Sequence, residues 1–112
     1  MASVSVVVEP DTLDPDSLRN MLEIEGCGSV ISFVGLTRGV DQGVEVQRLE
    51  FDAWEEKLPS VLQSLCFDAL DRFSVKSIVM AHRTGSVEPQ EPIVCIHVGS
   101  VHRAEGFEAC SW

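Results

Sequence analysis

The chain has 112 residues, close to the commonest size of a single domain, and its 45% hydrophobic and 23% charged residues are typical of globular and not disordered proteins. Eighteen acidic against eight basic residues give a formal net charge of −10, which argues against a nucleic-acid partner because phosphate neutralisation needs a basic face. We expect one domain over residues 1–112 with a packed core.

The cysteine pattern and the N-terminus bear on the cellular compartment. No two cysteines form a C-x-x-C pair, and most lie in apolar stretches, where buried free thiols are the usual outcome. A structural zinc site or a disulfide framework is therefore not expected, and a reducing compartment is favoured. Residues 1–10 lack a positively charged start, and the apolar run 4–8 is too short for a signal or membrane helix. We expect a cytoplasmic protein with no membrane partner.

The first third of the chain predicts a strand, a short helix and a second strand. Residues 3–9 are rich in valine and are followed by Pro10, which favours a strand. Asp14 is a suitable N-cap with Pro15 at the first helical position, and the following apolar spacing predicts a short amphipathic helix that ends near Gly26. Residues 27–34 are apolar on both faces of a strand, so we expect this strand to be central.

The rest of the chain predicts a loop, a long helix and further strands. Three glycines in residues 35–43 indicate a flexible loop, and apolar residues at helical spacing predict a long helix over residues 55–73 with one buried face. Ser100 is expected to cap a final helix. Further strands are predicted at residues 46–53, 75–81 and 93–99. The order β-α-β-β-α-β-β-α favours an α+β fold in which helices cover a mixed sheet.

Two segments are candidate anion sites. His102 and Arg103 lie where a strand gives way to a helix, and unpaired N–H groups and the helix dipole favour an anion there. The alternative is a solvated turn, and this segment alone does not separate the two. Thr37 and Arg38 lie in the glycine-rich loop, where an arginine can bind phosphate or carboxylate, although an exposed loop arginine is the commoner outcome.

Other polar residues favour structural roles. His82 and Arg83 end a strand, and we interpret His82 as structural rather than catalytic; His97 alternates with apolar neighbours and is expected to be packed. No G-x-S-x-G motif, phosphate loop or recognisable Ser-His-Asp set is present. The acidic cluster at residues 52–56 is better explained by a helix N-terminus than by a metal site. We expect neither a metal nor a cofactor.

The amino-acid sequences of three segments resemble those of a known protein family. The runs SVISFVGLTRG, LEFDAWEE and VMAHRTGSVEPQEPIVCIHVGSVHRAEGFEAC resemble the large subunit of molybdopterin synthase over nearly all of residues 27–110, and HRAEGFEA is the most specific part. The resemblance implies an α/β hammerhead-type fold that forms a homodimer and binds a small ubiquitin-like sulfur-carrier subunit at each end. It further implies that the carrier's C-terminal Gly-Gly thiocarboxylate donates sulfur to a cyclic pyranopterin monophosphate, a pterin phosphate substrate, in molybdenum cofactor biosynthesis.

The same resemblance assigns roles to individual residues. Phe33 matches an aromatic residue beside the family's substrate loop, and His82 and Arg83 are candidates for supporting contacts. His102 is either an anion ligand or a proton shuttle. The residues that match substrate-binding positions of the family are Leu36, Thr37, Arg38, His102 and Arg103.

The chain departs from the family pattern at its last helix. The family's last helix continues into a stretch with two catalytic lysines, whereas here Lys57 and Lys76 match neither position and no lysine follows Lys76. No catalytic residue is therefore assigned, and we expect little sulfur transfer from this chain. It is either a shortened form of an enzyme or a non-catalytic scaffold or carrier-binding homologue. An unrelated anion-binding module is the remaining alternative.

Overall fold

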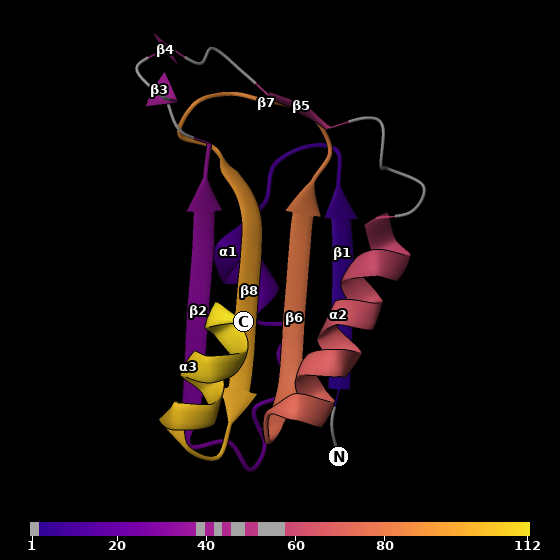
Figure 1. The fold of residues 1–112 in the computed structure, drawn as a ribbon, viewed down its shortest axis with the longest axis vertical. Coiled ribbons are helices and arrows are strands. Elements are labelled where there is room, and N and C mark those ends of the chain that lie inside the picture. Colours follow the sequence, from indigo (N-terminus) through magenta and orange to yellow (C-terminus); the bar gives the residue numbers. More distant parts are fainter. Residues whose placement is uncertain (1–2, 38–39, 42–43, 46–48, 52–57) are drawn as a thin grey trace.

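A mixed four-stranded sheet forms the centre of the protein. The computed structural model describes residues 3–37, 40–41, 44–45, 49–51 and 58–112. The strand order is β1-β6-β8-β2; β1 runs parallel to β6, and β8 is antiparallel to both of its neighbours (Figure 1). The strands are β1 (Ser3–Glu9), β2 (Ser29–Leu36), β6 (Val75–Arg83) and β8 (Pro92–Ser100). This arrangement confirms the predicted α+β fold with a mixed sheet.

Helices cover both faces of this sheet. Helices α2 (Leu58–Arg72) and α3 (Arg103–Ser111) lie side by side on one face, and the short helix α1 (Pro15–Arg19) lies on the other (Figure 1). Each face has its own apolar cluster. The α1 face buries Leu13, Leu18, Leu22, Val79, Ala81 and Cys95, and the α2–α3 face buries Cys66, Ala69, Val75, Ile78 and Val98. Strand β6 contributes to both clusters, which is why residues 75–81 are apolar almost throughout.

The first helix forms as its capping residues predict. The carboxylate of Asp14 accepts a hydrogen bond from the Asp16 N–H at 3.2 Å and from the Ser17 hydroxyl at 2.9 Å, and Pro15 opens the helix. The helix ends at Arg19, however, well before Gly26. Leu18 and Leu22 are nevertheless both buried, as the helical spacing predicted. Hydrogen-bonded turns follow Arg19, in which the Leu22 N–H donates to the Arg19 carbonyl, and they keep Leu22 on the core side.

Short strands occupy the end of the sheet where β2 and β6 finish. β3 (Val40–Asp41) pairs with β4 (Val44–Glu45), and β5 (Leu49–Phe51) pairs with β7 (Gly85–Val87). Residues 35–43 were expected to form a loop, but β2 extends to Leu36 and β3 lies within the same segment. The strand predicted over residues 46–53 is described only over β5, and β7 was not predicted.

Two expectations about the second strand and the last helix are wrong. β2 is an outer strand of the four-stranded sheet and not a central one, and Phe33 and Leu36 are about half exposed, at 48% and 50%. An apolar run shows that a strand has packing surface, but it does not show which strands pair with it. Ser100 is not the N-cap of α3 either; that position belongs to His102.

The long helix buries only part of its apolar stripe. α2 is described over 58–72, inside the predicted 55–73, and it buries Leu62, Cys66 and Ala69. Val61 and Leu65 on the same helix are nevertheless exposed. Among the described helices, none is both long and apolar enough to cross a membrane.

Candidate functional site

A groove lies where α3 begins beside the start of β2. It is open, has a volume of about 740 Å³, and brings the exposed His102 and Arg103 together. Its lining residues are Gly28, Ser29, Val30, Ile31, Val101, His102, Arg103, Ala104 and Phe107. One side is thus the beginning of β2, and the other is the first turn of the helix.

Buried contacts hold the junction between β8 and α3 in place. The hydroxyl of Ser100, which is fully buried, donates to the carbonyl of His102 at 2.6 Å, and the Gly28 N–H donates to the Ser100 carbonyl at 2.9 Å. A Cβ at position 28 would lie 2.5 Å from the carbonyl oxygen of Val101, so only glycine fits there. The turn that carries His102 and Arg103 is therefore held in place by Ser100 and Gly28.

The electrostatics of this junction favour an anion. α3 begins without a side-chain hydrogen bond from its N-cap residue, His102, so first-turn N–H groups remain for a ligand. Arg103 adds a positive charge and a planar donor set suited to phosphate or carboxylate. Glu105 in the same turn opposes an anion, and its Oε2 is buried with no hydrogen-bond partner among the described residues. The site can hold an anion in a chain that is strongly acidic overall.

The second predicted half of the site follows β2. Thr37 is buried, its N–H donates to the Glu91 carbonyl at 3.0 Å, and its own carbonyl accepts from the Gln90 N–H at 2.7 Å. Its Oγ1 is buried with no hydrogen-bond partner among the described residues. Leu36 is exposed next to it. Arg38 lies outside the described residues, so the structure says nothing of its position.

One copy of the chain does not bring these two halves together. The groove lies at the start of β2, where Ser29 pairs with Ser100, whereas Thr37 follows the other end, where Leu36 pairs with Pro92 (Figure 1). Seven residue steps of a strand separate the ends by roughly 23 Å at about 3.3 Å a step. His102 and Arg103 therefore cannot contact the same small substrate as Thr37 within one protomer.

The predicted supporting residues belong to the Thr37 end. Arg83 is buried, and its Nη1 donates to Oε2 of Glu91 at 3.2 Å, while Oε1 of Glu91 accepts from the Glu88 N–H at 3.0 Å. Nδ1 of His82 lies 2.6 Å from the Arg83 carbonyl, so it is the protonated ring nitrogen in this contact. Because the main-chain carbonyl of Glu91 also accepts the Thr37 N–H, these contacts hold Thr37 in place at the end of β2.

Comparison with known proteins decides the family. A model described as "MoaE protein" matches residues 8–112. The chain belongs to the MoaE protein family. It is 29% identical over 111 residues to a molybdopterin synthase catalytic subunit of Pyrococcus abyssi, covering 99% of this chain and 75% of that protein. It is 32% identical over 102 residues to the protein of the same name from Homo sapiens, covering 91% of this chain and only 54% of the relative.

A solved structure shares the fold of this MoaE-family chain. Subunits 1 and 2 of the molybdopterin-converting factor of Helicobacter pylori were solved as a protein–protein complex, and one of its chains superposes with a TM-score of 0.71 at 22% identity. The match covers 95% of this chain and 72% of the other. At this identity, the likeness shows the fold and no more.

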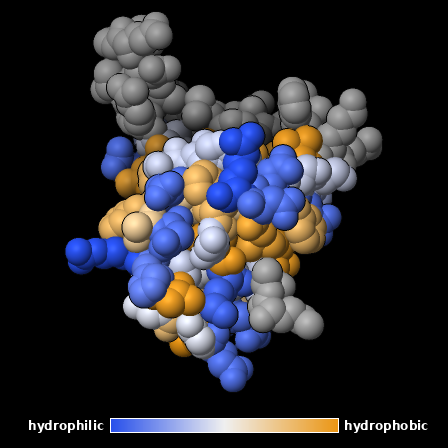
Figure 2. Space-filling view, turned by 60° about the horizontal axis from the view of Figure 1, so that its bottom comes forward, coloured by the Kyte–Doolittle hydropathy of each residue, from blue (hydrophilic) through white to orange (hydrophobic). Residues whose placement is uncertain are grey.

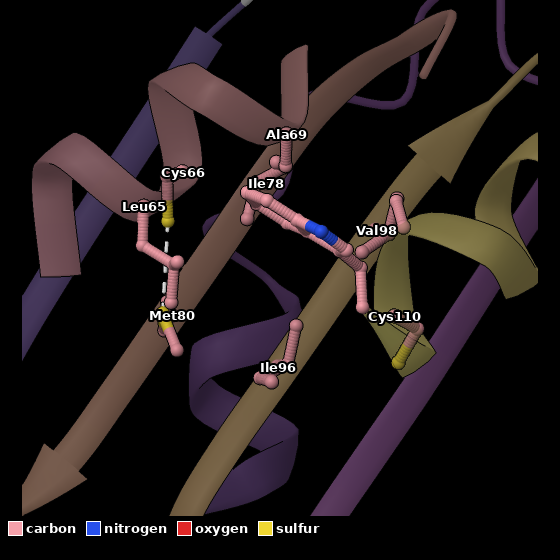
Figure 3. Close-up of a pocket in the computed structure, with 10 residues that line it drawn as sticks. Leu65, Cys66, Ala69, Ile78, Met80, Ile96, Val98 and Cys110 are labelled. Atoms are coloured by element: carbon pink, nitrogen blue, oxygen red, sulfur yellow. Dashed lines mark hydrogen bonds between the residues drawn. The ribbon is translucent and has the colours of Figure 1, made fainter. Parts of the chain in front are cut away.

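A second pocket in this MoaE-family chain is apolar, and its thiols are poor nucleophiles. It is a cavity of about 60 Å³ between α2, α3, β6 and β8, lined by residues such as Leu65, Cys66, Met80 and Cys110 (Figure 3). Figure 2, which turns the lower end of Figure 1 toward the viewer, shows hydrophobic side chains gathered between hydrophilic ones. Burial raises the pKa of Cys66 to about 11 and also raises the pKa of Cys110. Both thiols are protonated at neutral pH and are poor nucleophiles.

One polar cluster was missed in the sequence. His97 is buried, as expected, but its Nδ1 lies 2.6 Å from the hydroxyl of its cross-strand partner Ser32, an exposed residue. Its Nε2 lies 3.0 Å from the Pro15 carbonyl and 3.2 Å from Sγ of Cys95. The signal was a single polar residue among apolar neighbours, Ser32 in β2 and His97 in β8, but their pairing depends on strand register. Among the described residues, no three potential ligands gather as a metal site requires.

Proposed function

We propose that this chain acts as the large subunit of molybdopterin synthase. In this role it transfers sulfur from the thiocarboxylated C-terminal Gly-Gly of a ubiquitin-like carrier to a cyclic pyranopterin monophosphate. The observation that carries the proposal is the exposed His102–Arg103 pair at an uncapped helix N-terminus, in a chain whose family match spans residues 8–112. The names of the relatives above support the same activity.

The chemistry of the two substrates suits this groove. A pterin phosphate and a thiocarboxylate are both anions, and Arg103 with the first-turn N–H groups of α3 supplies donors and positive charge. His102 is exposed beside Arg103, where it can donate to an anion or exchange a proton with a substrate. The surrounding apolar wall, which includes Ile31 and Phe107, suits the planar pterin.

We further propose that the working site is shared by two copies in a homodimer. Within one protomer, Thr37 and the groove lie at opposite ends of β2, so a substrate that contacts both needs His102 and Arg103 from one copy and the Thr37–Arg38 loop from another. Phe33 and Leu36, which precede Thr37 on β2, are exposed and apolar and favour burial against another chain. Sedimentation equilibrium should give twice the monomer mass, and a monomer at all concentrations would contradict the shared site.

The partner and the compartment follow from the same proposal. The complex of two subunits seen for the Helicobacter pylori protein supports a small-subunit partner for this chain, and we propose the carrier in that position. The four unpaired cysteines suit a reducing compartment, and we propose the cytoplasm. The chain spans about half the length of the human relative. The sulfur-transfer activity of the whole enzyme is therefore a proposal for this chain.

The test combines binding and turnover. The chain is mixed with a carrier ending in Gly-Gly, and affinity is measured by calorimetry before and after Arg103→Ala. Loss of a charge-assisted hydrogen bond of about 1.5–3 kcal/mol should weaken binding of the carboxylate terminus roughly ten-fold or more. Arg19→Gln is the matched control, because Arg19 is an exposed arginine on the opposite face of the sheet. Equal losses in both variants would contradict an anion site at α3.

The alternative function is a carrier-binding homologue without chemistry. No lysine follows Lys76 in the sequence, so we expect little molybdopterin from this chain with thiocarboxylated carrier and pterin substrate. Binding without turnover supports a carrier-binding role for these 112 residues. Near-normal turnover would contradict the expected impairment and would show that other residues carry out the transfer.

A further inference from the structure

We propose that Ser32 is a nucleophile activated by His97, and that it accepts an acyl group from a small ester or thioester that carries a negative charge. The site lies on the α1 face of the sheet and uses neither His102 nor Arg103. It is therefore independent of the sulfur-transfer proposal.

The hydrogen bonds define the protonation of the histidine ring. The Pro15 carbonyl can only accept, so Nε2 of His97 must carry the proton in their 3.0 Å contact. Nδ1 then has a free lone pair, and the hydroxyl of Ser32, 2.6 Å away, donates to it. A nucleophile bonded to a base, with the base oriented by a third group, is the arrangement that activates serine in acyl-transfer enzymes. Here the third group is a main-chain carbonyl.

The surroundings keep the ring neutral and fixed. Burial lowers the pKa of His97; the Pro15 carbonyl acts in the opposite direction, the charge of Arg19 lowers the pKa and that of Asp16 raises it. The only other titratable group in contact among the described residues is the buried thiol of Cys95, whose pKa burial raises. A neutral imidazole at neutral pH is the form that can accept a proton.

Ser32 is an exposed residue, and α1 carries an exposed cation. Ser32 is exposed on β2 and faces the opposite side of the sheet from its neighbour Phe33, so a ligand can approach it from the α1 face without crossing the surface proposed for the dimer. Arg19 is exposed in the last turn of α1, the helix whose Pro15 carbonyl contacts His97. Arg19 can attract an anionic acyl donor, although Asp16 on the same helix opposes it, so an anionic ester is the substrate that tests the role of Arg19.

The step balances without a further reactant. Oγ of Ser32 attacks the carbonyl carbon, forming a C–O bond, while its proton passes to Nδ1 of His97. The bond from the carbonyl carbon to the leaving oxygen or sulfur then breaks, and the leaving group takes the proton from His97. Water, activated in the same way, can later hydrolyse the acyl-serine and regenerate the hydroxyl.

The test uses the intact chain and 4-nitrophenyl esters. We expect stoichiometric release of nitrophenolate and an acyl group on Ser32 by mass spectrometry of peptides. General-base assistance contributes about 10²- to 10⁴-fold, so His97→Gln should slow acylation about 100-fold or more, and Ser32→Ala should abolish the adduct. Ser60→Ala is the matched control, since Ser60 is exposed on α2 over the other face. Acylation of Ser32 no faster than that of Ser60 would overturn the proposal.

A second measurement does not depend on how the buried histidine variant folds. Arg19 is on the surface, so Arg19→Gln should leave the fold unchanged. The wild-type chain should react faster with the anionic 4-nitrophenyl succinate than with neutral 4-nitrophenyl acetate. Arg19→Gln should remove this preference, by about two- to five-fold as is typical of an exposed charge pair. Equal rates with both esters in the wild-type chain would overturn the assignment of an anionic substrate.

Discussion

The close packing of α3 on the sheet can be tested at one glycine. Gly106 is buried, and a Cβ there would lie 2.9 Å both from Cγ1 of Ile31 and from Oγ of Ser100. Neither neighbour can yield easily, because Ile31 is branched next to its backbone and the Ser100 hydroxyl is bonded to the His102 carbonyl. Alanine in a helix gains about 0.5–1 kcal/mol over glycine, but overpacking costs about 1–3 kcal/mol. We expect Gly106→Ala to lose about 1 kcal/mol net.

Urea unfolding followed by circular dichroism measures this loss. With an m-value of about 1–2 kcal/mol per molar, the midpoint should fall by roughly 0.5–1 M. The difference in unfolding free energy between Glu108→Ala and Glu108→Gly measures the helix preference of alanine over glycine without overpacking, since Glu108 is exposed on the same helix. If Gly106→Ala is as stable as the wild-type chain or more so, α3 does not need this close approach, and the anchoring of the His102–Arg103 turn is wrongly explained.

Four further changes test other parts of the structure. Asp14→Ala removes the cap of α1 and should lower the free energy of unfolding by about 1 kcal/mol; no change in the urea midpoint would refute the cap. Gly28→Ala places a Cβ 2.5 Å from the Val101 carbonyl, and we expect a loss of about 2–3 kcal/mol in the same assay, with a small effect arguing against the tight turn. His97 has a lowered pKa in the folded chain, so the unfolded chain, titrating near 6.5, binds protons first as the pH falls. Stability should therefore decrease below about pH 6.5, and His97→Gln should flatten that decrease in unfolding curves from pH 8 to 5. With a pKa of about 11, Cys66 should resist iodoacetamide at pH 8 in the native chain and react once unfolded; rapid native alkylation would contradict its burial.

Features set by neighbouring residues were predictable from the sequence. The Asp14–Pro15 start of α1, the apolar spacing of α2, and the valine-rich strand β1 all depend on contacts a few residues apart, and the structure confirms them. The end of α1 was less predictable, because Leu18 and Leu22 are buried whether or not the intervening turn is helical.

Features set by strand pairing were not predictable in the same way. The apolar run of β2 suggested a central strand, yet the sheet order places it outside, with Phe33 half exposed. The contact between Ser32 and His97 depends on the register of β2 against β8, and a shift by one residue would turn one side chain to the other face. Nothing within either strand specifies that register.

The same distinction governs the candidate site. That His102 and Arg103 begin a helix is a local property, and the structure places them, exposed, at the start of α3. That they share a pocket with Thr37 is a statement about topology, and β2, which separates the two along its whole length, makes it untrue of a single copy. The family resemblance matched both segments in sequence without specifying how many chains the pocket needs. An anion bound at α3 alone would be held by one arginine, one imidazole and a helix terminus, opposed by Glu105. A second copy that supplied Arg38 would change that balance of charge, which is the physical reason for expecting dimerisation and substrate affinity to be linked.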